Sequence, residues 1–99
     1  MSCNRTQICG RLETRGTLRF SPAGVALVEF TMAHRSEQNE ANVWRKVACV
    51  VQAIAAGVVA QEIAKLPAGT QVSVEGFLTQ AGRSSSALVL HVLNFELIE

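Results

Sequence analysis

The sequence predicts an all-β domain with one short helix, in which five strands close a Greek-key β-barrel. Runs of alternating apolar and polar residues recur along the 99 residues, and turns rich in Pro, Gly, Ser or Asn separate them. A single Ala-rich segment, 53–66, has the composition of a helix. Because one helix is too few for the crossovers of a parallel sheet, a parallel α/β fold is excluded. The length favours a single domain, 1–99, with one core.

The first half of the chain predicts two strands joined by a turn. The first strand is expected at 5–15, and Gly10 within it indicates a bulge or a sharp bend. The turn at 21–24 has the sequence Ser-Pro-Ala-Gly, in which proline sets φ and glycine tolerates positive φ. A second strand is expected at 25–35, with its apolar residues on one face. The polar segment 36–42 lacks periodicity and is predicted to be a hairpin loop.

The second half predicts a third strand at 43–51, which directs Val47, Cys49 and Val51 inward. The chain has three cysteines without C-x-x-C spacing, and they are expected to be small buried residues. The remaining elements are a helix at 53–66 ended by Pro67-Ala68-Gly69, a strand at 70–79, a flexible loop at 81–86 and a strand at 87–98.

This order of elements is that of the OB-fold, a five-stranded Greek-key barrel with its helix between strands 3 and 4. The last strand carries apolar residues on both faces, with Leu90 and Val92 on one and Leu93 and Phe95 on the other. An antiparallel strand that is apolar on both faces must be covered on its outer face too. A second copy is the simplest cover, so a homodimer is predicted.

The composition argues against an enzyme. The chain has no Asp and no Tyr, and its Glu residues do not fall at a spacing that predicts a paired acid and base. His34 and His91 have no partner at metal-ligand spacing, and no nucleotide-cradling glycine motif occurs, so neither a metal nor a cofactor is expected. His34 is interpreted either as a surface hydrogen-bonding residue or as a DNA contact. The chain has no apolar run long enough for a membrane span and no secretory signal, which predicts a cytoplasmic protein.

The sequence does contain the residue types that hold single-stranded nucleic acid. Binding needs cations along the phosphates and flat side chains on which bases stack. Trp44 and Lys46 alternate on the strand face opposite the inferred core. Trp44 could instead pack in an interface or at the barrel end, and Phe77 is expected to face outward as a second platform or an interface residue. Three further cations lie near loop and strand ends: Arg19, Arg35 and Arg83.

Three segments resemble the bacterial single-stranded-DNA-binding proteins. Arg19–Gly24 resembles their R-[YF]-x-P-x-G turn, Trp44–Val47 resembles the strand in which a Trp stacks on bases, and Gly69–Gly76 resembles their fourth strand. A smaller relative, the primosomal replication protein N (PriB) family, is more similar. The shared segments are Ser21-Pro22-x-Gly24, His34-Arg35-Ser36 and Glu75-Gly76-Phe77. This resemblance, over about 5–98, implies a homodimeric OB-fold that binds single-stranded DNA and docks on the PriA helicase to reload the replication machinery. It implies DNA contacts at Arg19, Arg35 and the loop around Arg83.

Two other functions also fit the sequence. A general single-stranded-DNA-binding protein would continue past the barrel in a long tail with an acidic tip, whereas this sequence ends at Leu97-Ile98-Glu99. A protein-interaction module would fit the net charge of only +1 and the sparse aromatic residues. RNA is an alternative ligand, because stacking on an aromatic ring does not distinguish the sugars. Our hypothesis is a shallow groove that holds a single strand with little sequence preference.

Overall fold

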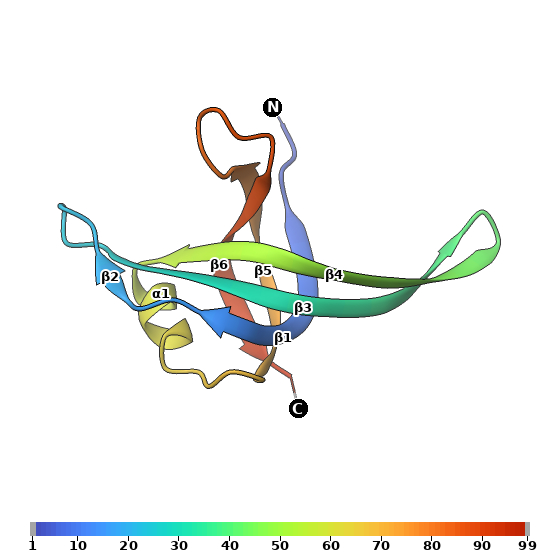
Figure 1. The fold of residues 1–99 in the computed structure, drawn as a ribbon, viewed down its shortest axis with the longest axis horizontal. Coiled ribbons are helices and arrows are strands. Elements are labelled where there is room, and N and C mark those ends of the chain that lie inside the picture. Colours follow the sequence, from blue (N-terminus) through green and yellow to red (C-terminus); the bar gives the residue numbers. More distant parts are fainter. Residues whose placement is uncertain (1, 99) are drawn as a thin grey trace.

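Five long strands close a barrel in the computed structural model, which describes residues 2–98 (Figure 1). The sheet order is β1-β5-β6-β4-β3-β2, and an additional β1–β3 pairing closes the barrel. β4 and β6 pair in parallel and the other neighbours pair antiparallel. The elements are β1 (Thr6–Arg15), β2 (Arg19–Phe20), β3 (Ala26–Glu40), β4 (Val43–Ala56), α1 (Val58–Ile63), β5 (Gln71–Gln80) and β6 (Leu88–Leu97).

The predicted OB-fold is confirmed, and its helix lies between β4 and β5. These are the third and fourth of the long strands, because the two-residue β2 adds one to the numbering. Alternate residues of the strands fill the interior, and α1 adds Ala60 and Ile63. The largest fully buried side chains are Leu12, Val28, Met32, Ile63, Val72, Val74 and Leu90.

β1 pairs with two different strands along its length, and this double pairing closes the barrel. Its first half pairs with β5 and its second half with β3, and Arg11 has partners in both. A Cβ added at Gly10 would lie 2.8 Å from the carbonyl oxygen of Ala33, so glycine permits this close approach. The bulge itself lies between Leu12 and Thr14. The bulge expected at Gly10 is therefore displaced along the strand.

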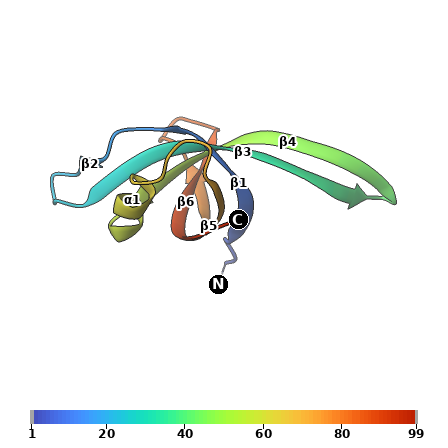
Figure 2. The same cartoon turned by 90° about the horizontal axis from the view of Figure 1, so that it is seen from below.

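β3 and β4 continue far beyond the barrel as a two-stranded ribbon (Figures 1 and 2). The hairpin loop predicted at 36–42 is wrong, because the strands pair as far as Glu40 and Val43. Only Ala41 and Asn42 form the turn, with φ of 52° and 65°. Two successive positive φ angles are typical of the tight hairpin turn whose twist matches its strands. The segment is polar because it projects into solvent, not because it is irregular.

The ribbon also changes the environment of Cys49. Val51 is half-buried, but Cys49 lies on the ribbon beyond the barrel and is exposed, as are Cys3 and Cys9. The prediction that the cysteines are buried is therefore wrong. The alternation that places Cys49 on the core side of β4 is present, but no core extends that far.

The helix is shorter than the composition predicts. Residues 53–56 remain in β4, where Ala53 and Ala55 are buried and pair with both β3 and β6. Gly57, with φ of 73°, ends the strand, and α1 begins at Val58. Pairing on both edges of β4 therefore overrides the helix propensity of alanine at 53–56.

Candidate nucleic-acid interface

The ribbon presents Trp44, Lys46 and Arg35 on one face. The cross-strand pairs Asn39–Trp44, Glu37–Lys46 and Arg35–Ala48 follow each other at every second position. Side chains at that spacing share a face, and this one continues the outer surface of the barrel. Trp44 is 68% exposed, so its ring does not pack in the core of this chain.

The two cations on this face are available to a ligand. Neither Arg35 nor Lys46 forms a salt bridge within residues 2–98, and both line a shallow depression of about 310 Å³. Arg45 points to the opposite face, and its Nε donates to Glu40 Oε1 at 2.6 Å. The outer face of the ribbon therefore combines an exposed indole with two cations that form no salt bridge on the described chain, although Glu37 is the cross-strand neighbour of Lys46.

The other two predicted cations lie away from this group. Arg19 is on β2, and its Nη2 donates to Glu29 Oε1 at 2.8 Å. Arg83 is in the exposed loop between β5 and β6, which stands at the top of Figure 1, away from the ribbon tip. The structure thus brings together Arg35, Trp44 and Lys46, and leaves Arg19 on β2 and Arg83 in the β5–β6 loop, apart from them.

Phe77 faces outward from β5, as the alternation predicts, and stacks on His91 of β6. The two ring centroids are 4.9 Å apart and the rings are inclined by 16°. Phe77 and His91 are direct cross-strand partners, which explains the stack. His91 was not among the predicted site residues. The outward alternation of β6 could have indicated it, but only the register between β5 and β6 places it against Phe77.

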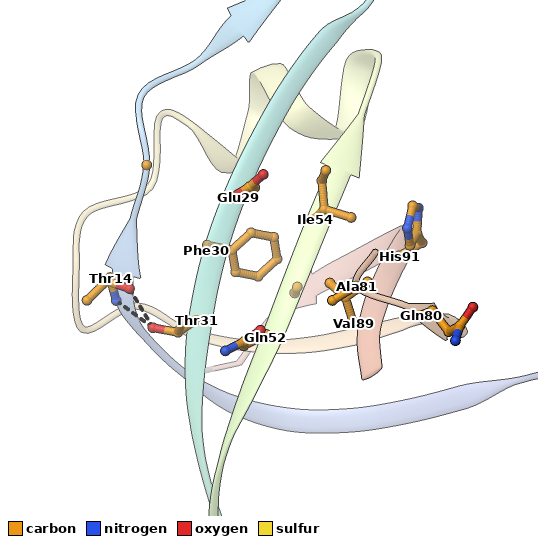
Figure 3. A pocket seen from close by; sticks show the side chains of 12 residues that line it. Thr14, Glu29, Phe30, Thr31, Gln52, Ile54, Gln80, Ala81, Val89 and His91 are labelled. Atoms are coloured by element: carbon orange, nitrogen blue, oxygen red, sulfur yellow. Dashed lines mark hydrogen bonds between the residues drawn. The ribbon is translucent and has the colours of Figure 1, made fainter. Parts of the chain in front are cut away.

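A cleft of about 650 Å³ lies beside this pair on the outer surface of the barrel (Figure 3). β3 and β4 form its floor, and the ends of β1, β5 and β6 surround it. Figure 3 shows Thr14 and Thr31 at one side and Gln80 and His91 at the other. Its side chains are apolar or neutral except Glu29, and it contains no lysine or arginine.

The hydrogen bonds of His34 support its interpretation as a surface hydrogen-bonding residue. Its Nδ1 lies 2.6 Å from the carbonyl oxygen of Cys9, so Nδ1 donates. In the neutral ring, Nε2 then accepts from the Ser36 hydroxyl at 2.8 Å. Both ring nitrogens are used within the protein, and they tie the base of the ribbon to the free edge of β1.

One carboxylate away from the ribbon, Glu75 of β5, has its pKa lowered by its neighbours. The Arg5 guanidinium donates to Glu75, with Nε 2.6 Å from Oε2, and together with Asn94 it lowers the pKa of Glu75 below its usual 4.5.

Over residues 2–98, no three His, Cys, Asp or Glu side chains gather as metal ligands would. In the same described part, no helix has the length and apolar character to cross a membrane. Both the ribbon face and the cleft are hollowed enough to take a ligand.

Comparison with known proteins relates this arrangement to single-strand binding proteins. Residues 4–94 match a family described as another single-strand binding protein family. Replication restart protein PriB of Nitrosomonas europaea is 35% identical over 98% of this chain and 92% of its own. The solved structure of PriB from Ralstonia solanacearum has a TM-score of 0.89 at 31% identity, covering 99% of this chain and all of that one. The Thermus aquaticus single-stranded DNA binding protein has a TM-score of 0.78 at 21% identity, over 98% of this chain and 50% of that one, and shows the shared fold.

Proposed function

This chain belongs to the replication restart protein PriB family, and from that premise we propose that it binds single-stranded DNA during replication restart. The observation that carries the proposal is the ribbon face, where Trp44 stands exposed beside Lys46 and Arg35. In this proposal the chain binds its ligand and performs no catalysis. Because the proposed role is in DNA replication, we expect the protein in the cytoplasm.

The three ribbon residues divide the binding between them. Stacking of one base on an aromatic side chain contributes about 1–3 kcal/mol, and Trp44 offers an exposed ring for it. Lys46 and Arg35 follow at two-residue spacing on the paired strands and neutralise phosphates beside that base. Arg83 extends the path at the β5–β6 loop. Arg19 contributes less, because Glu29 already pairs with it.

A bridging role follows from the family. We infer that the chain docks on the PriA helicase while holding DNA, and so brings the replication machinery to a stalled fork. We also infer a homodimer. Its support is that three leucines of β6, one at each end of the strand and one at the bulge, are exposed: Leu88 (56%), Leu97 (59%) and Leu93 (60%). Phe95, which was expected on the outer face of the last strand, does not support the homodimer, because a bulge at Leu93 turns Phe95 toward the core.

The test uses the single tryptophan as its own probe. Oligo-dT is titrated into the protein at two salt concentrations while Trp44 fluorescence and the anisotropy of the labelled strand are followed. We expect quenching, and a log–log salt slope of about −0.7 for each neutralised phosphate, hence about −2 for Arg35, Lys46 and Arg83. Light scattering on the same sample gives the mass and tests the dimer.

A second function has one observation in its favour. The net charge of +1 is low for a nucleic-acid-binding protein and fits a protein-interaction module of the primosome. That function predicts weak DNA binding by anisotropy, no quenching of Trp44 and a negligible salt slope. The same titration therefore decides between the two.

A further inference from the structure

A depression of about 300 Å³ lies on the outer surface where β1 parts from β3, and we call it the β1 depression. Its lining holds two arginines, no carboxylate and no aromatic ring: Cys9, Gly10, Arg11, Ala33, Arg35 and Gln71. Arg35 also lines the depression on the ribbon, beside Lys46. The two hollows therefore share Arg35 as a common border.

The strand register puts both arginines of the β1 depression on one face of the sheet. Arg11 of β1 is the cross-strand partner of Ala33 in β3 and of Gln71 in β5, so these three side chains share a face. Arg35 follows Ala33 by two residues on β3 and therefore points the same way. Ala33 neighbours both arginines, and its small side chain leaves the space between them hollow.

Both guanidinium groups are available to an anion from outside the chain. Arg35 forms no salt bridge within residues 2–98. Arg11 has a single weak one, in which its Nη2 lies 4.0 Å from Glu13 Oε2 and both side chains are exposed. Because an exposed pair contributes only about 0–1 kcal/mol, an incoming anion can replace Glu13. The Gln71 carboxamide at the same rim adds a neutral donor.

We propose that the β1 depression binds a backbone phosphate of the single strand, next along from the phosphate on Arg35, with Arg11 as its cation. This inference rests on the proposed function, since it extends the same binding path from the ribbon onto β1. Arginine presents a planar fork of N–H donors that matches the oxygens of a phosphate. The depression has no ring on which a base could stack, so it receives the backbone and not a base.

The position of the β1 depression suits a strand that leaves the ribbon along β3. Asn39, the partner of Trp44, and Ala33, the partner of Arg11, are six residues apart on β3. At about 3.3 Å per residue this is about 20 Å of strand, and OB-folds bind about 4–16 nucleotides each. A carboxylate of a protein partner is the other anion that could enter. The border shared through Arg35 favours phosphate, because it makes the β1 depression a continuation of the ribbon path.

The test compares wild-type protein with three variants in oligo-dT binding, followed by anisotropy at several salt concentrations. Arg11→Ala removes the proposed contact, and Arg11→Lys keeps its charge. Lys65→Ala is the matched control, because it removes the same charge from an exposed residue that lines neither depression. Arg11 is exposed, so its variants are expected to fold, and circular dichroism checks this.

We expect the log–log salt slope to become shallower by about 0.7 in Arg11→Ala and to stay unchanged in Arg11→Lys and Lys65→Ala. An unchanged slope in Arg11→Ala, or an equal change in Lys65→Ala, overturns the inference. A slope that Arg11→Lys does not preserve also overturns it, since the charge would then not be the cause. In each of these cases salt-sensitive quenching of Trp44 would persist and the proposed function would stand.

A wild-type protein that binds no strand would refute the proposed function, and this inference with it. A labelled poly-glutamate peptide is then titrated into the same protein. Binding that Arg11→Ala weakens would assign the β1 depression to an acidic protein partner instead of DNA.

Discussion

Replacing Gly76 by alanine should cost this domain much of its stability. Gly76 lies buried in β5 opposite Val92, next to the pair that stacks Phe77 on His91. An added Cβ would lie 1.7 Å from the carbonyl oxygen of His91 and 2.8 Å from its carbonyl carbon. Since both atoms belong to the backbone, no rotamer change relieves the clash. β6 must move by about 1.3 Å merely to restore a 3.0 Å separation.

The cost follows from what that movement breaks. Overpacking costs about 1–3 kcal/mol, and each ladder hydrogen bond lost adds about 0.5–1.5 kcal/mol. With one ladder hydrogen bond lost, we therefore expect a decrease of about 1.5–4.5 kcal/mol in the free energy of unfolding, and a fall in Tm of at least about 6 °C. Gly82→Ala is the matched control, because a Cβ there meets no atom within 4 Å. It should change stability by no more than about 0.5 kcal/mol.

Urea unfolding followed by circular dichroism measures both variants, and a thermal scan measures Tm. Trp44 fluorescence is unsuitable as the main signal, since the side chain is 68% exposed in the folded protein. If Gly76→Ala stays within about 1 kcal/mol of wild type, then β5 and β6 are not packed as tightly as described. The stacking of Phe77 on His91 and the position of His91 in the wall of the cleft would then be wrong as well.

Three further predictions concern the ribbon and one ion pair. Trp44→Ala should weaken oligo-dT binding by about 5- to 150-fold with little change in Tm, and unchanged affinity would remove Trp44 from the site. Lys46→Ala should make the log–log salt slope shallower by about 0.7, whereas Arg45→Ala, on the opposite face and already ion-paired, should not; equal effects would contradict the assignment of faces. Because Arg5 lowers the pKa of Glu75, the folded state binds its proton less readily than the unfolded state, so this stabilisation is present above about pH 4.5 and is lost as the pH falls through the lowered pKa. Glu75→Gln should therefore lose Tm less steeply than wild type below pH 4.5, and parallel curves would exclude this linkage.

The two largest errors of prediction have the same physical origin. Polar residues without periodicity at 36–42 indicate contact with water, and both an irregular loop and a strand pair projecting from the barrel have that contact. The alanines at 53–56 favour a helix in isolation, yet small side chains also suit a strand that packs against the interior of a narrow barrel. In both segments the local sequence permits two structures, and strand pairing selects one.

The sequence by itself determined the properties that depend on neighbours along the chain. The order of strands and helix, the Pro-Gly turn at 21–24 and the shared face of Trp44 and Lys46 all follow from local patterns, because a strand has a period of two residues wherever it lies. Only the tertiary structure decided which strands meet and in what register. A single extra residue at Leu93 reverses the faces of β6, and distant packing sets its position. For this reason the stack of Phe77 on His91, the cleft and the reach of the ribbon could not be derived from the sequence.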